Sequence, residues 1–220
     1  MIKPDTIIRS DRKTLSVCID PLGRVTVRAP KRCSEERIFA FLQEKEGWIE
    51  KHKRKTAGAC MRLPSENLDG FTFLLLGKDC RVSLVEKRNI SFDAESYTLY
   101  LPQNNARERL VRWLKDNAKR ILSAVTAQKA REMGVSYASV RITSAKTRWG
   151  SCSANNAVRY TFRLLYAPKE VIEYVVVHEL SHTVQKDHSK AFWAVVARFV
   201  PDWKERRKWL KDNAVLMEIF

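Results

Sequence analysis

The chain of 220 residues lacks the features that mark several classes of protein. Its longest apolar stretches, residues 71–76 and 174–177, fall far short of the roughly 20 residues that a membrane-spanning helix needs. It has no internal repeat, no low-complexity tract, no glycine-rich phosphate loop and no Ser-His-Asp spacing. We therefore expect one globular unit or two small packed parts, without a membrane span and without a P-loop nucleotide site.

The five cysteines form no Cys-x-x-Cys pair, so neither a zinc ribbon nor a disulfide framework is expected. They are scattered and odd in number: Cys18, Cys33, Cys60, Cys80 and Cys152. The first residues also carry no apolar core of a signal peptide. Together these absences favour a cytoplasmic protein whose thiols stay reduced.

Histidine is scarce as well, yet three of the four histidines lie within eleven residues: His178, His182 and His188. At i and i+4 of a helix, His178 and His182 point toward one ion, and a catalytic zinc takes three protein ligands. Glu179 lies about 100° round the helix from His178, which suits a general base better than a ligand. The His-Glu-x-x-His pattern therefore predicts a metal-dependent hydrolase that activates water.

The helix that carries this pattern is signalled by Pro168 in its first turn, by Glu170 near its N-terminus and by the valine-rich run that follows. By itself the five-residue pattern also occurs on helices without a metal. The spacing from His182 to His188 equals that of the metzincins. Those enzymes place glycine three residues after the second histidine, where this chain has Gln185, so a metzincin is disfavoured.

Several ordered segments resemble the YgjP-like metal-dependent hydrolases, relatives of the SprT and WLM zinc peptidases. These are residues 147–153 (TRWGSCS), 160–164 (YTFRL), 167–168 (AP), 174–182 (YVVVHELSH) and 188–193 (HSKAFW), with residues 23–30 and 48–49 upstream and 201–210 downstream. The resemblance thus covers nearly the whole chain.

The resemblance implies that His178, His182 and His188 bind one metal ion, zinc or another divalent transition metal, and that Glu179 is the catalytic carboxylate. It implies a zincin-like C-terminal part and a peptide or protein substrate. Thr161 departs from the family, which often has asparagine there. Cys152 lies in a segment that the resemblance brings near the site, so it is considered as an extra ligand.

The net charge of +16 is the second large signal. Residues 151–220 contribute only +3 of it, so most of the basic excess lies outside the metal-binding segment. Such a surplus attracts polyanions, although a solvated surface tolerates it too. Two alternatives to a peptidase stay open: a metal-dependent nucleotide phosphohydrolase or pyrophosphatase, and a nucleic-acid-binding protein with a structural or vestigial metal site.

The periodicity predicts an α+β protein in two parts. Residues 1–103 form a β-rich part with one helix. The predicted strands are residues 14–19, 25–28, 71–76, 80–85 and 97–101. Ser34 is expected to cap the helix, and residues 56–70 are the linker candidate. Residues 104–220 begin with a long basic-faced helix over 106–133 that ends at Gly134, and continue into a small sheet and the metal helix.

Candidate substrate-binding residues follow from position only. Alternation over residues 158–164 predicts a strand with one buried face, and as an edge strand beside the cleft it would pair with an extended peptide. Arg148 or Arg163 would then meet an anionic group of the substrate. Arg148, Tyr160 and Tyr166 are candidates for stabilising the oxyanion.

Overall fold

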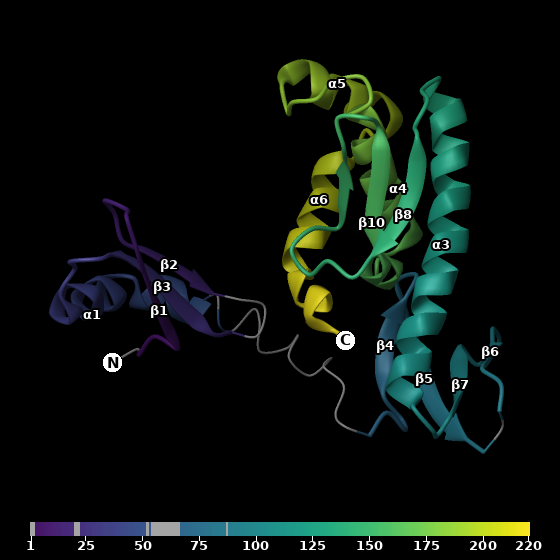
Figure 1. The fold of residues 1–220 in the computed structure, drawn as a ribbon, viewed down its shortest axis with the longest axis horizontal. Coiled ribbons are helices and arrows are strands. Elements are labelled where there is room, and N and C mark those ends of the chain that lie inside the picture. Colours follow the sequence, from purple (N-terminus) through teal and green to yellow (C-terminus); the bar gives the residue numbers. More distant parts are fainter. Residues whose placement is uncertain (1–2, 20–22, 52, 54–66, 87) are drawn as a thin grey trace. The chain divides into compact units, whose positions relative to one another are not determined.

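The computed structural model describes residues 3–19, 23–51, 53, 67–86 and 88–220. The chain forms two compact units, Met1–Leu63 and Pro64–Phe220. The sequence predicted two parts that meet near residue 103, whereas residues 67–102 belong to the second unit because their last strand packs against the helix that follows (Figure 1). The predicted linker, residues 56–70, lies largely outside the described residues.

The first unit is a three-stranded mixed sheet with helix α1 (Glu35–Glu44). Its strands are β1 (Thr6–Ser10), β2 (Ser16–Ile19) and β3 (Val25–Pro30), in the order β1-β3-β2. As predicted, Ser34 caps α1: its Oγ accepts a hydrogen bond from the Arg37 N–H at 3.4 Å. The expected single helix is interrupted at Lys45, and residues 46–51 are helical again. The unit's core consists of Val25, Val27, Ala29, Ile38, Leu42 and Ile49.

The second unit begins with a four-stranded mixed sheet in the order β4-β5-β7-β6. Its strands are β4 (Thr72–Leu75), β5 (Lys78–Val85), β6 (Ser91–Asp93) and β7 (Thr98–Pro102). The five strands predicted before residue 103 are present, and β1 and β6 were missed. Both missed strands are largely exposed, so they carry too little apolar alternation to be recognised in the sequence.

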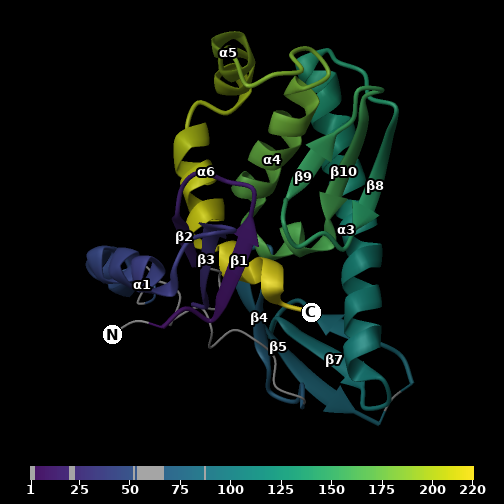
Figure 2. The same ribbon diagram turned by 60° about the vertical axis from the view of Figure 1, so that its left-hand side comes forward.

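Helix α3 (Ala106–Met133) ends as predicted, because Gly134 adopts φ 65° and its N–H bonds back to the Ala130 and Arg131 carbonyls. One stripe of α3 is buried, formed by Leu110, Leu114, Ala118, Leu122, Thr126 and Ala130. The helix contacts β7 near one end, and β8, η1 and α4 elsewhere along its length (Figures 1 and 2).

A second, three-stranded sheet has the order β8-β10-β9. Its strands are β8 (Ser139–Thr143), β9 (Gly150–Cys152) and β10 (Ala157–Thr161). The sequence predicted an edge strand over residues 158–164. That prediction is wrong in two respects: β10 is the central strand, and after Thr161 the chain turns into the 3-10 helix η1 (Phe162–Tyr166). All of η1 is buried, so its alternation of residue types does not correspond to two faces.

Helices complete the second unit around the sheet β8-β10-β9. They are α4 (Lys169–Ser181), α5 (Lys190–Phe199), α6 (Trp203–Asp212) and the 3-10 helix η2 (Ala214–Glu218). Helix α4 packs against α3, α5, α6 and β9. Separate helices and mixed sheets make the chain an α+β protein, and none of its described helices combines the length and hydropathy needed to cross a bilayer.

Candidate metal centre

Three imidazoles converge at the C-terminal end of α4. His178 lies in the last turn of α4, His182 follows at its C-cap with helical dihedral angles, and His188 lies just before α5. Each offers one ligand nitrogen, and these atoms lie within 4.8 Å of one another. In the described part of the chain this group consists of the histidines alone, and the Cys152 thiol donates instead to the Ser153 carbonyl, with Sγ 3.6 Å from the oxygen.

The spacing of the nitrogens fits a tetrahedral ion. Nε2 of His178 lies 3.2 Å from Nε2 of His188. Two ligands at the usual zinc–nitrogen distance of about 2.0–2.1 Å in a tetrahedral arrangement lie roughly 3.3 Å apart. Nδ1 of His178 is buried without a hydrogen-bond partner among the described residues. With Nε2 directed at the ion, Nδ1 is the nitrogen that carries the proton, and the described residues offer it no acceptor.

A backbone contact orients the second histidine. Nδ1 of His182 lies 3.1 Å from the Gln185 carbonyl oxygen, so this nitrogen carries the proton and Nε2 is left with its lone pair. The Gln185 N–H in turn donates to the Ser181 carbonyl at 2.9 Å. Gln185, which distinguished this chain from the metzincins, therefore lies in the turn that orients His182.

Aromatic rings enclose the three imidazoles. The Phe192 ring is fully buried and lies 4.5 Å from the His182 ring and 4.9 Å from the His178 ring, centroid to centroid. Trp193 lies 5.8 Å from the His188 ring. Both residues belong to the first turn of α5, whose N-cap Ser189 accepts a hydrogen bond from the Phe192 N–H. The cap therefore begins the helix directly after His188 and brings Phe192 against all three rings.

Burial keeps two of the imidazoles neutral. It lowers the pKa of His178 to about 3, with further lowering by His182, His188 and Arg207. Burial also lowers the pKa of His182, against the opposing effect of its contact with Gln185. Neutral imidazoles have free lone pairs at physiological pH, which metal ligation requires.

Glu179 follows His178 on α4 and is only 5% exposed. Burial raises its pKa to about 8, although the positive charge of Arg148 acts in the opposite direction. Strand β9 approaches this carboxylate through Gly150: a Cβ added there would lie 2.6 Å from Glu179 Oε1 and 2.8 Å from Cγ. Only glycine at position 150 lets the strand come so close.

Along the outer edge of β9, backbone groups have no hydrogen-bond partner among the described residues. Trp149 and Ser153 bond to β10, through Thr161 N–H to the Trp149 carbonyl and Ser153 N–H to the Ala157 carbonyl. Because hydrogen-bonded pairs alternate along antiparallel strands, Gly150 and Cys152 direct their N–H and C=O groups away from β10. The edge next to Glu179 thus offers two residues for pairing with an extended chain.

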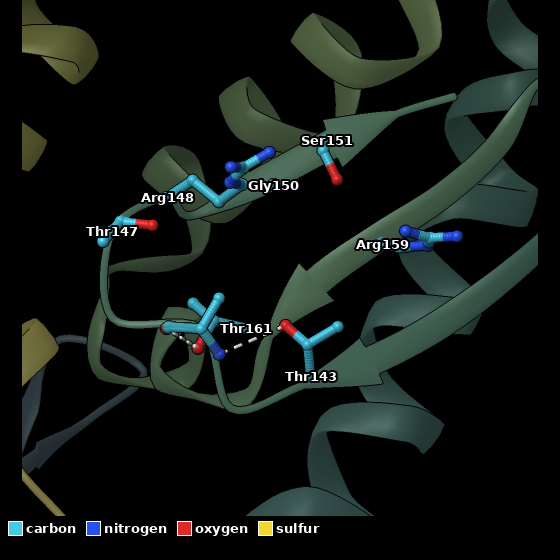
Figure 3. Close-up of a pocket in the computed structure, with 8 residues that line it drawn as sticks. Thr143, Thr147, Arg148, Gly150, Ser151, Arg159 and Thr161 are labelled. Carbon is cyan, nitrogen blue, oxygen red and sulfur yellow. Dashed lines mark hydrogen bonds between the residues drawn. The ribbon is translucent and has the colours of Figure 1, made fainter. Parts of the chain in front are cut away.

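The structure separates the four candidate substrate-binding residues. Arg148 lines a pocket on the sheet beside Gly150 (Figure 3). Tyr160 is fully buried, with its hydroxyl 3.2 Å from the Thr126 hydroxyl, and Tyr166 is fully buried as well. Arg163 is 2% exposed and donates to the carbonyls of Ser144, Ile219 and Phe220. Of the four, Arg148 alone has a position from which it can meet a substrate.

Thr161, the departure from the family pattern, supports the loop that carries Arg148. Its Oγ1 donates a hydrogen bond of 2.9 Å to the Ala145 carbonyl, and Thr143 Oγ1 lies 3.4 Å from the Ala145 N–H. These two threonines hold the loop at residues 144–149 against the sheet. The Thr161 hydroxyl therefore supplies the hydrogen-bond donor for the Ala145 carbonyl.

Sequence reasoning missed Gly150 and Phe192 as parts of the site. Gly150 was read only as a residue of the TRWGSCS segment, and no strand was predicted there, so the close approach that a glycine in a strand signals was not recognised. Phe192 was read as part of the HSKAFW segment, and nothing in its spacing separates core packing from contact with three imidazoles. Tyr174, one helical turn before His178, also lies against that ring, with centroids 5.9 Å apart.

Comparison with known proteins gives a family and a likeness to solved structures. No curated protein sequence matches this chain. Among solved structures, the metallopeptidase zymogen of Pyrococcus abyssi abylysin is similar with 22% identity and a TM-score of 0.38, covering 41% of this chain and 92% of that one. The family model of the YgjP-like metallopeptidase domain matches residues 13–213, which is most of the chain. The chain therefore belongs to the YgjP-like metallopeptidase domain family.

Proposed function

We propose that this protein is a zinc-dependent peptidase, in which His178, His182 and His188 hold one ion and Glu179 acts as general base. The observation that carries the proposal is the convergence of three imidazoles at the end of α4, the helix whose buried Glu179 lies against Gly150 of the edge strand β9. The family supports a peptidase, and a cluster of nitrogen ligands favours zinc, although other divalent transition metals bind the same donors.

Zinc in such a site supplies Lewis acidity, which lowers the pKa of water to about 7 and polarises a carbonyl group. The chain's own residues supply binding and proton transfer. Gly150 and Cys152 pair with an extended peptide, which brings a scissile bond beside Glu179. The Glu179 carboxylate takes a proton from the attacking water and returns it to the leaving amine. Its raised pKa suits both steps near neutral pH, because a general base works best when its pKa lies near the working pH.

The test couples metal content to cleavage in two variants. Glu179→Gln keeps the size of the side chain, so it should retain one ion per chain while peptide cleavage falls by about 10²–10⁴-fold. His182→Ala should lose the ion as well as the activity. Undiminished cleavage by purified Glu179→Gln would refute the role of Glu179.

The phosphohydrolase alternative uses the same metal centre and differs in substrate. A panel of nucleoside triphosphates, assayed for released phosphate, distinguishes the two. Phosphate release that His182→Ala abolishes, with no cleavage of any peptide, would replace the peptidase proposal. Peptide cleavage without phosphate release would support it.

A further inference from the structure

A pocket of about 370 Å³ (Figure 3) lies on the outer face of the sheet β8-β10-β9. This face is turned away from the buried side chains of Val158 and Tyr160. We call the pocket the basic pocket. It is lined by Thr143, Ala145, Thr147, Arg148, Gly150, Ser151, Arg159 and Thr161. Four of these residues carry a hydroxyl and two carry a guanidinium group.

The strand register explains why these side chains meet. Ser151 pairs with Arg159 across β9 and β10, and Thr143 pairs with Thr161 across β8 and β10. Paired residues project to the same face, and residues two apart on one strand do so too. The loop at residues 144–149 adds Thr147 and Arg148 at the side of β9.

The charge around the basic pocket is of one sign. Residues 133–168 contain no aspartate or glutamate and five basic residues. Of these, Arg163 is bound to carbonyl groups and Lys146 lies 3.9 Å from Glu218. Within the described ranges no carboxylate forms an ion pair with Arg159, and the electrostatic partner of Arg148 is Glu179 itself. The Arg159 guanidinium thus remains available to an anion, and Arg148 adds positive charge to the pocket lining, whereas Arg141 does not line the pocket.

The basic pocket is one strand away from the proposed reaction. Gly150 borders the pocket on one side and presses against the Glu179 carboxylate on the other. A peptide paired with the open edge of β9 continues the pleat of the sheet, so every second side chain of the peptide projects on the outer face. On that face, a side chain of the peptide lies close enough to contact Ser151 and Arg148, as diagonal neighbours on adjacent strands do.

We propose that the basic pocket binds the carboxylate of an aspartate or glutamate side chain of the peptide, within two residues of the scissile bond. This inference rests on the proposed peptidase function. The Thr143 and Thr161 hydroxyls already donate to the Tyr160 and Ala145 carbonyls. Guanidinium groups match the planar carboxylate with paired hydrogen bonds, and the Thr147 and Ser151 hydroxyls donate further ones. The enzyme therefore prefers acidic sequences.

Matched peptides that differ only in glutamate or glutamine at one position test the preference. For the wild type, kcat/KM should be about tenfold higher for the glutamate peptide at the best position, the effect expected of a charge-assisted hydrogen bond. Arg159→Gln should bring this ratio close to one. Arg141→Gln is the control, because Arg141 pairs with Arg159 on the same face, is exposed and does not line the pocket. A ratio near one in the wild type at every position, or an equal loss of the ratio in both variants, would overturn the proposal.

Binding to the Glu179→Gln variant separates this proposal from the proposed function. Fluorescence anisotropy of the same two peptides should show tighter binding of the glutamate peptide, and Arg159→Gln in that background should abolish the difference. If the wild type cleaves no peptide but this difference is found, the basic pocket stands and the peptidase function fails. If peptides are cleaved without acidic preference, the peptidase function stands and the proposal for the basic pocket fails. Orthophosphate that displaces the glutamate peptide better than chloride at equal ionic strength would overturn the assignment to a peptide carboxylate.

Discussion

Replacing Gly150 with alanine places a methyl group where the Glu179 carboxylate now lies. The new Cβ would be 2.6 Å from Oε1, and ordinary contact begins at 3.4 Å, so the carboxylate must move by about 0.8 Å. Glu179 is 5% exposed, which leaves little room for that movement. Displacing a catalytic group by about 1 Å costs on the order of 100-fold in rate. We expect kcat/KM of Gly150→Ala to fall by about that factor.

The same variant should lose about 1–3 kcal/mol of unfolding free energy, as overpacked sites do. Its metal content should stay at the wild-type level, because the three atoms nearest to the new Cβ all belong to Glu179 and not to a histidine. Gly47→Ala is the control, since a Cβ there meets nothing within 4 Å and Gly47 lies in a helical segment. Steady-state kinetics, metal analysis and urea unfolding provide the readouts. Full activity in Gly150→Ala would refute the idea that β9 confines the catalytic carboxylate.

Two further predictions concern stability. Arg163→Met should lower the free energy of unfolding by about 2–4 kcal/mol, because it removes charged hydrogen bonds to three carbonyls. Substitution of the exposed Arg141 by Met should change that free energy by no more than about 0.5 kcal/mol. Equal urea midpoints for the two variants would contradict a structural role of Arg163. In the metal-free protein, a Glu179 pKa raised from 4.5 to about 8 gives a stabilising contribution that is complete below pH 4.5 and is lost as the pH rises through about 8. Calorimetry should therefore show the Tm of the metal-free wild type falling relative to metal-free Glu179→Gln between pH 5 and pH 8, and parallel curves would contradict the burial of an ionisable carboxyl.

The metal centre was the most predictable part of the site because its geometry is local. His178 and His182 are one helical turn apart, and His188 follows within six residues, so helix geometry and chain length suffice to bring them together. The boundaries of α3 were predictable for a similar reason, since Gly134 ends the helix by its own backbone conformation.

The substrate side of the site depends on strand order, which local patterns do not determine. Whether β9 or β10 lies at the edge is decided by pairing between strands, and β9 is too short, at three residues, to show alternation. Arg163 and Tyr160 were misjudged for a related reason. A polar group at a plausible position can face inward when the interior offers it a partner, as the Ser144 carbonyl does for Arg163 and Thr126 for Tyr160.

The buried residues of α3 have a geometric consequence for the second unit. They recur at every fourth position from Leu110 to Ala130, and four residues advance 400° around an α-helix. Each step therefore rotates the buried stripe by about 40°, and over five steps it passes about 200° around the axis. One straight helix thus turns opposite sides toward β7 and toward the sheet that bears Gly150. Both sheets of the second unit pack against α3. We therefore expect them to unfold together in one cooperative transition.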